Sequence, residues 1–330
     1  MRHPSILKTL GLLCAVFIAT NASAQPAENY PGKPVRVIVP YSPGGATDII
    51  ARHVTTKLSE ATGQQFIVDN RAGASGNIAL ELAARALPDG YTLLVGNVST
   101  NAINETTFAQ SLRTVPSRDL IGVTKLIEIP HIVAATPGLP ANDIKQFIEL
   151  ARRPDSRINY GSAGIGTYPH LDMVVLAKAT GIDVTHVPFK GGAGQMVPGL
   201  ISGEVQVMFV NLASSLPQVR AGRMKALATT APQRLPELPS VPTMAEQGFV
   251  GIGTNAWNGM FAPAALPQPV LQRLYKQVAV ILERPEFKEM LAKQLMTVSI
   301  SASPAAFTEL VKAETRKWAN VVKENNIKIE

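Results

Sequence analysis

Residues 35–54 read VRVIVPYSPGGATDIIARHV, which gives a strand, a glycine loop and a helix in succession. Val35 to Val39 form a run of strand length that is apolar except for Arg36, and Pro43-Gly44-Gly45 follows it. Apolar residues then recur at helical spacing between Ile49 and Leu58. This order predicts a buried strand that turns through a glycine loop into an amphipathic helix.

The same alternation extends outward from this unit. The next strands are expected at residues 66–68 and 91–95, with a helix at residues 77–86 between them. A second series is expected later in the chain, with strands at residues 158–160, 184–187, 205–210 and 224–228 and helices at residues 171–179, 196–201 and 212–221. Repeated strand–helix–strand order indicates a parallel sheet covered on both faces. The sequence therefore predicts an α/β fold with two similar halves.

A long apolar segment at residues 127–135 interrupts this rhythm. Pro130 lies within it and cannot donate a hydrogen bond to a sheet ladder. We predict that this segment crosses between two lobes and that a strand at residues 257–262 carries the chain back. The expected organisation is a signal peptide at residues 1–24, the first part of lobe 1 at 25–125, lobe 2 at 126–253, and a return to lobe 1 with C-terminal helices at 254–330.

The C-terminal part has two apolar stripes at helical spacing, at residues 271–282 and 307–322. Ser303 is placed to cap the second helix, and Pro304 suits its first turn. Stripes of this kind usually face a core, so we assign them no separate function.

The N-terminus has the three parts of a secretory signal. Arg2 and Lys8 supply positive charge, residues 9–20 are mostly apolar, and Ala22-Ser23-Ala24 offers a cleavage site. The alternative is a membrane anchor, but the apolar run is only about a dozen residues, whereas a spanning helix needs about 20. We therefore predict cleavage after Ala24 and a soluble monomer in the periplasm. The single cysteine, Cys14, lies within this signal, so disulfides cannot support the mature fold.

Composition disfavours a nucleic-acid partner. The chain carries a formal net charge of +7, but its Lys and Arg residues are spread out and aromatic residues make up only 5%. A mild positive excess favours an anionic ligand.

Glycine-rich loops recur where predicted strands pass into helices. They lie at residues 41–48, 70–77, 96–101, 160–167 and 189–194. Glycine lets backbone N–H groups turn inward and lets a ligand approach closely, and a helix that begins there adds unpaired N–H donors. In open α/β sheets such loops gather at the carboxyl ends of the strands, where ligands bind. Glycine can also serve only to turn the chain, but its repetition over both halves favours an anion-binding site.

Catalytic and metal-binding patterns are missing from the sequence. It has no nucleophile elbow, phosphate-loop lysine motif or zinc helix motif, and no cofactor is expected. The histidines after the signal, His53, His131, His170 and His186, are scattered. Each is expected to be a structural or surface histidine, although His170 lies beside a glycine loop and is the best candidate for the cleft. No set of residues supplies a nucleophile, a base and an oxyanion donor, so an enzyme is not indicated.

The sequence resembles the Bug family, the extracytoplasmic binding proteins of tripartite tricarboxylate transporters, over nearly all of the mature chain. The segments that carry this resemblance are Tyr30 to Arg36, Pro43-Gly44-Gly45 with Asp48, Asn70 to Gly73 with Gly76, Pro88 to Leu93, Tyr160 to Gly164, Val187 to Gly191 and Phe261 to Ala264. The resemblance implies a type II periplasmic binding protein, with two lobes that close on a small carboxylate. It also implies the membrane subunits of the transporter as partners.

Together, the loops and the resemblance define the candidate ligand-binding residues. They are Tyr41, Ser42, Gly44, Gly45, Ala46, Thr47, Asp48, Ala74, Ser75, Gly76, Asn77, Asn97, Ser99, Thr100, Ser162, Gly164, Thr167, His170, Lys190, Gly191 and Asn211. The family usually has an Asp directly before the position of Asn211, and this chain has Val210 instead. We therefore expect a ligand without an ammonium group, such as an aliphatic or aromatic carboxylate.

Two other functions are compatible with this reading. A periplasmic receptor could report its ligand to a sensor protein instead of a transporter. A secreted hydrolase is the alternative from a different class, and turnover of simple esters or amides would be its signature.

Overall fold

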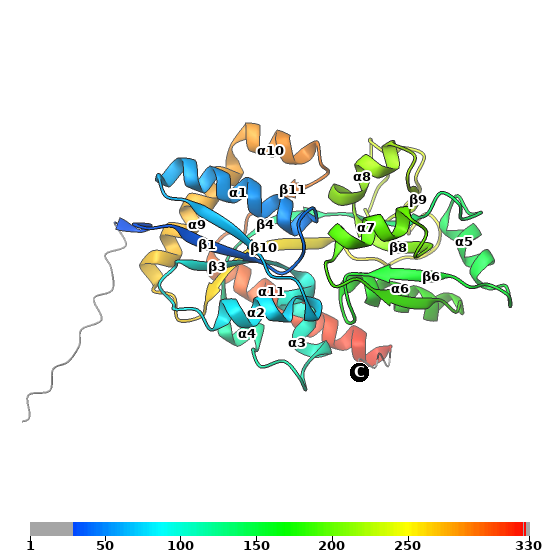
Figure 1. Ribbon diagram of the computed structural model, residues 1–330, viewed down its shortest axis with the longest axis horizontal. Helices are drawn as coiled ribbons and strands as arrows, with labels where there is room; N and C mark the ends of the chain where they lie inside the picture. Colours follow the sequence, from blue (N-terminus) through cyan, green and yellow to red (C-terminus); the bar gives the residue numbers. More distant parts are fainter. Residues whose placement is uncertain (1–28, 326, 328–330) are drawn as a thin grey trace, which may run out of the picture.

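The computed structural model of the chain describes residues 29–325 and residue 327. The predicted signal peptide lies outside the described residues. Two sheets, each covered by helices, lie side by side and form two lobes (Figure 1). None of the described helices combines the length and the apolar character that a bilayer-spanning helix requires.

Lobe 1 is built on a six-stranded sheet with the order β11-β4-β10-β3-β1-β2. Its strands are β1 (Val35–Val39), β2 (Phe66–Asn70), β3 (Thr92–Asn97), β4 (Leu120–Ile129), β10 (Ala256–Pro263) and β11 (Thr297–Val298). One core includes residues of α1 (Ala46–Thr62), α9 (Gln268–Glu283) and α10 (Pro285–Ala292). Another includes residues of α2 (Asn77–Ala84) and α11 (Pro304–Glu324). Short turns at Ala74–Gly76 and Ser99–Ile103 and the helices α3 (Asn104–Thr107) and α4 (Pro116–Asp119) complete this lobe.

Lobe 2 has a five-stranded sheet with the order β7-β6-β8-β5-β9. Its strands are β5 (His131–Ala135), β6 (Asn159–Ser162), β7 (Thr185–Pro188), β8 (Val207–Asn211) and β9 (Lys225–Thr229). The helices α5 (Ile144–Ala151) and α6 (Tyr168–Thr180) contribute to one core, and α7 (Ala193–Ile201) and α8 (Leu212–Arg220) contribute to the other. Both lobes are therefore three-layered, with apolar sheet residues buried between helices.

The predicted parallel sheets are in fact mixed, which corrects that expectation. β1 pairs in parallel with β2 and β3, and β6 pairs in parallel with β7 and β8. However, β10 runs antiparallel to its neighbours β3 and β4, and β5 runs antiparallel to β8 and β9. The reason lies in the crossings, since the chain leaves lobe 1 through β4 and returns beside it through β10.

Pro130 separates the two sheets. β4 ends at Ile129 in the first sheet, and β5 begins at His131 in the second. Pro130 has no N–H to donate to either ladder, which suits the position where the pairing partners change. The strand of the first sheet thus extends to Ile129, beyond the expected lobe boundary between residues 125 and 126.

The two predicted C-terminal stripes form α9 and α11, and both helices pack on the first sheet. Ser303 caps α11 as predicted, because its hydroxyl accepts a hydrogen bond from the N–H of Ala306 at 3.1 Å, and Pro304 occupies the first turn. The helices α5 and α10 were not predicted from the sequence. A capping side chain marks the start of α5, where the carboxylate of Asp143 accepts from the N–H of Gln146 at 2.8 Å.

Candidate binding site

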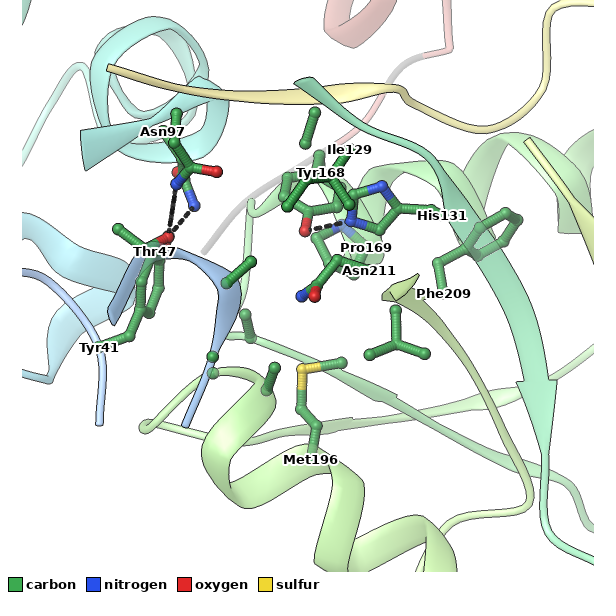
Figure 2. Close-up of a pocket in the computed structure, with 18 residues that line it drawn as sticks. Tyr41, Thr47, Asn97, Ile129, His131, Tyr168, Pro169, Met196, Phe209 and Asn211 are labelled. Carbon is green, nitrogen blue, oxygen red and sulfur yellow. Dashed lines mark hydrogen bonds between the residues drawn. The ribbon is translucent and has the colours of Figure 1, made fainter. Parts of the chain in front are cut away.

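A cavity of about 40 Å³ lies between the lobes. It is lined by Tyr41, Gly45, Ala46, Thr47, Asn97, Ile129, His131, Ala163, Tyr168, Pro169, Gly192, Ala193, Met196, Phe209, Val210, Asn211, Ala256 and Asn258 (Figure 2). Within the described part of the chain, this lining contains no Asp, Glu, Lys or Arg. Any charge on a ligand would therefore meet only dipoles, neutral polar groups and apolar walls.

Lobe 1 presents the beginning of α1 to the cavity. Gly45 is the residue before this helix, and no side chain caps the helix there. The first backbone N–H groups of a helix have no partner within it, and they form the positive end of its dipole. This geometry suits a carboxylate without requiring a charged side chain.

Thr47 places a hydroxyl beside these N–H groups. Its Oγ1 accepts hydrogen bonds from Nδ2 of Asn258 at 2.7 Å and, at a longer 3.5 Å, from Nδ2 of Asn97. Figure 2 shows the amide of Asn97 directed at Thr47. Because the oxygen already accepts twice, the hydroxyl proton is available to a ligand acceptor.

Asp48 stabilises the loop that precedes α1. Burial raises the pKa of its carboxyl, but hydrogen bonds from Arg52, Asn70 and the N–H of Gly44 outweigh this effect and leave the pKa below its usual value. Oδ2 accepts from Gly44 N–H at 3.0 Å, and Oδ1 accepts from Asn70 Nδ2 at 2.9 Å. The carboxylate therefore fixes the shape of the loop and does not line the cavity.

Lobe 2 adds a histidine–tyrosine pair and an amide to the opposite wall. His131 Nε2 lies 2.6 Å from the Tyr168 hydroxyl, and both side chains are buried. Burial lowers the pKa of His131 to about 3, so the imidazole is neutral at physiological pH. Asn211 caps α8 by accepting the N–H of Ser214 at 2.9 Å. Figure 2 shows its amide pointing into the space between Thr47 and Tyr168.

Residues 50–327 match the sequence model of the tripartite tricarboxylate transporter family receptor. The chain belongs to this family. The protein BugT of Bordetella pertussis is 30% identical, with 96% of this chain and 97% of BugT covered. These receptors are periplasmic solute-binding proteins, and the fold is one that solute-binding proteins share.

Solved structures show the same architecture with ligands present. The R. palustris protein Rpa4515, solved with adipate, is 32% identical and has a TM-score of 0.85, with 90% of this chain and 98% of that chain covered. MatC from Rhodopseudomonas palustris, solved with bound malate, is 31% identical and has a TM-score of 0.83, with 89% and 100% covered. The predicted two-lobed periplasmic binding-protein fold is therefore confirmed.

In this receptor, some of the predicted site residues line the cavity and others do not. Those in the lining are Tyr41, Gly45, Ala46, Thr47, Asn97 and Asn211. Those outside it are Ser42, Gly44, Asp48, Ala74, Ser75, Gly76, Asn77, Ser99, Thr100, Ser162, Gly164, Thr167, His170, Lys190 and Gly191.

Several of the residues outside the lining join the two lobes. The N–H of Ser42 donates to the carbonyl of Gly191 at 3.2 Å. The hydroxyl of Ser75 donates to the carbonyl of Ile165 at 2.8 Å, and that of Ser99 accepts the N–H of Tyr168 at 3.0 Å. The glycine loops thus meet across the cleft in a closed arrangement.

Other predicted residues stabilise their own loops. Ser162 and Thr167 donate to the carbonyl of Gly164 at 3.0 and 2.7 Å. Nδ1 of His170 accepts the N–H of Gly166 at 3.0 Å, and its ring stacks on His186 with 4.2 Å between centroids. The sequence favoured His170 as the histidine of the cleft. In the structure His170 stabilises a loop, and it is His131 that lines the cavity.

The sequence reading did not select His131, Tyr168 or Asn258 for the site. His131 directly follows Pro130 in the predicted crossing segment, and Asn258 lies in the strand that carries the chain back. His131 and Asn258 are polar residues in otherwise apolar strands that cross between the lobes. Such strands border the cleft, so a polar residue on them is a candidate for its lining.

Proposed function

We propose that this receptor captures a small carboxylate between its lobes and delivers it to the membrane subunits of a tripartite tricarboxylate transporter. The observation that carries the proposal is the uncapped start of α1 beside Thr47, at a cavity whose lining lacks charged side chains. Helix N–H groups and a free hydroxyl proton complement a carboxylate, and an enclosed site strengthens their attraction.

The proposed ligands are aliphatic di- or tricarboxylates and aromatic acids. Adipate and malate in the related structures favour small aliphatic acids within that range. The proposal also includes a mature chain that begins at Gln25 and acts as a periplasmic monomer without catalytic turnover. Intact-mass measurement of exported protein tests the start of that chain.

A thermal-shift screen of mono-, di- and tricarboxylates, including aromatic acids, tests the proposed binding. A ligand at about 100 times its dissociation constant adds about 2.7 kcal/mol to the free energy of unfolding. We expect at least one acid to raise the melting temperature, whereas neutral sugars leave it unchanged. Stabilisation by sugars and by no acid would contradict the proposal.

A further inference from the structure

The lobe 2 side of the cavity differs chemically from the start of α1. Its apolar surface comes from Met196, Phe209 and Val210. Its polar groups in the lining are the side chains of Asn211, Tyr168 and His131, which lie together opposite Thr47 (Figure 2). The part of a ligand that points away from α1 must fit this surface.

Asn211 offers a donor to this space. Its Oδ1 is engaged by the N–H of Ser214 at 2.9 Å, where it caps α8. Its Nδ2 is therefore the group left for a ligand, and an amide nitrogen only donates.

The His131–Tyr168 pair offers an acceptor. Burial lowers the pKa of His131 to about 3, so the ring is neutral, and its Nδ1 has no hydrogen-bond partner among the described residues. The 2.6 Å between Nε2 and the Tyr168 oxygen is shorter than the roughly 2.9–3.0 Å usual for an N–H donor and fits an O–H donor, so we assign the donor role to Tyr168 and the acceptor role to Nε2. The hydroxyl proton of Tyr168 is then bonded to His131 within lobe 2. The lone pairs of the Tyr168 oxygen remain available to a donor on the ligand.

We propose that the ligand is a compact hydroxy monocarboxylate, whose carboxylate lies at α1 and whose hydroxyl donates to Tyr168 and accepts from Asn211. This inference rests on the proposed capture of a small carboxylate, and within that class it favours a monocarboxylate over the di- and tricarboxylates named above. A hydroxyl both donates and accepts, which matches the pair of groups on lobe 2. A second carboxylate only accepts, so Nδ2 of Asn211 would donate to it, but Tyr168, whose proton goes to His131, would not.

The size of the cavity limits the ligand further. A cavity needs roughly 10–15 Å³ to hold one water molecule, so about 40 Å³ corresponds to only a few waters. A short acid such as a hydroxybutyrate suits this space better than a long dicarboxylate.

Calorimetry with four-carbon acids tests the inference. The panel is butyrate, which has no second polar group, 2-, 3- and 4-hydroxybutyrate, which carry a hydroxyl at successive positions, and succinate, which has a second carboxylate. We expect the best hydroxybutyrate to bind the wild type about tenfold more tightly than butyrate or succinate, as two added neutral hydrogen bonds would give.

Substitution of Tyr168 isolates the hydroxyl contact. In Tyr168→Phe the preference for the best hydroxybutyrate over butyrate should shrink to about twofold. Tyr160→Phe is the matched control, because Tyr160 is a buried tyrosine of lobe 2 that stacks on His186 outside the cavity lining. It should keep the wild-type preference.

Each outcome is informative. Tightest binding of succinate, equal binding of butyrate and all hydroxybutyrates, or an unchanged preference in folded Tyr168→Phe would overturn the inference and leave carboxylate capture intact. Binding of no acid in this panel or in the wider screen would instead remove the proposed function. If Tyr168→Phe does not fold, the wild-type panel alone decides.

Discussion

Thr47 shows how one residue can serve both the fold and the site. It is buried in the first turn of α1, and its hydroxyl accepts from Asn258, a residue that β10 brings back from far along the chain. The network leaves one proton for a ligand, so the hydroxyl is oriented before any ligand arrives. Such preorganisation lowers the entropic cost of binding.

Replacement of Thr47 by Val should therefore weaken binding of the preferred carboxylate by about 10- to 100-fold, since a hydrogen bond to a charged group contributes about 1.5–3 kcal/mol. Thr55→Val is the matched control, because Thr55 is buried in the same helix but bonds the carbonyl of Arg52 away from the cavity. Calorimetry on both variants is the measurement. Equal affinity of Thr47→Val and wild type would exclude this hydroxyl from the site.

Val210 leads to a second prediction at this scale. It lines the cavity and is almost fully buried, so an ammonium group placed there would lack an anionic partner. We expect butyrate to bind more tightly than 4-aminobutyrate, whose ammonium group would lie at the far end of the ligand, on the lobe 2 side. Val210→Asp should reduce that preference, provided the variant folds. Tighter binding of the amino acid by the wild type would contradict this explanation.

At the scale of elements, the start of α7 is packed against the loop before α1. A Cβ atom on Gly194 would lie 2.3 Å from the carbonyl oxygen of Pro43 in the other lobe. Gly164 is similarly close to Ser75 across the cleft, with 2.5 Å from its added Cβ to Oγ. Because Gly194 and Gly164 have no side chain, the two lobes can approach each other closely at these positions. Glycine is needed there for contact between the lobes and not for contact with a ligand.

Gly194→Ala should consequently hinder closure while the protein still folds, because alanine is favourable within a helix. We expect weaker ligand binding and a larger radius of gyration in small-angle scattering with ligand present. Gly138→Ala is the control, since a Cβ there meets nothing within 4 Å. A ligand-bound scattering profile of Gly194→Ala identical to that of wild type would show that closure tolerates the added methyl group.

The order of strands and helices was predictable because each strand–loop–helix unit consists of residues that are neighbours in sequence, as in residues 35–54. The mixed sheets were not, because the antiparallel pairing of β10 with β3 joins residues such as Asn258 and Asn97 that lie far apart in sequence. The same limit applies to the site. Thr47 and Asn97 lie in or beside local glycine loops, whereas His131 and Asn258 join them only through the interlobe crossings.

At the scale of the whole molecule, two buried histidines and the partly buried His186 should make the fold sensitive to acid. Burial lowers the pKa of His131 to about 3 and that of His170 and His186 to about 4. In the unfolded chain histidines titrate near pH 6.5, so the unfolded state takes up protons first as the pH falls. The stability contributed by these residues is complete above about pH 6.5 and is lost toward about pH 4.

Asp172 acts in the opposite direction. Burial raises the pKa of its carboxyl to about 7, so its contribution is present at low pH and is lost as the pH rises toward 7. Urea unfolding from about pH 7.5 to about pH 5 should show a decreasing free energy of unfolding in wild type and a steeper decrease in Asp172→Asn, by at most about 1.4 kcal/mol per pH unit. Equal slopes in the two proteins would contradict this assignment.

The most direct test of carboxylate capture compares an acid with its neutral isostere. Calorimetric titration of the mature protein with the tightest-binding carboxylate and with the corresponding primary amide changes only the group expected at the start of α1. We predict clear binding of the acid and at least about 100-fold weaker binding of the amide, because the helix N–H groups and Thr47 supply donors to an anion. Equal affinity for the acid and the amide would show that the cavity does not recognise a carboxylate.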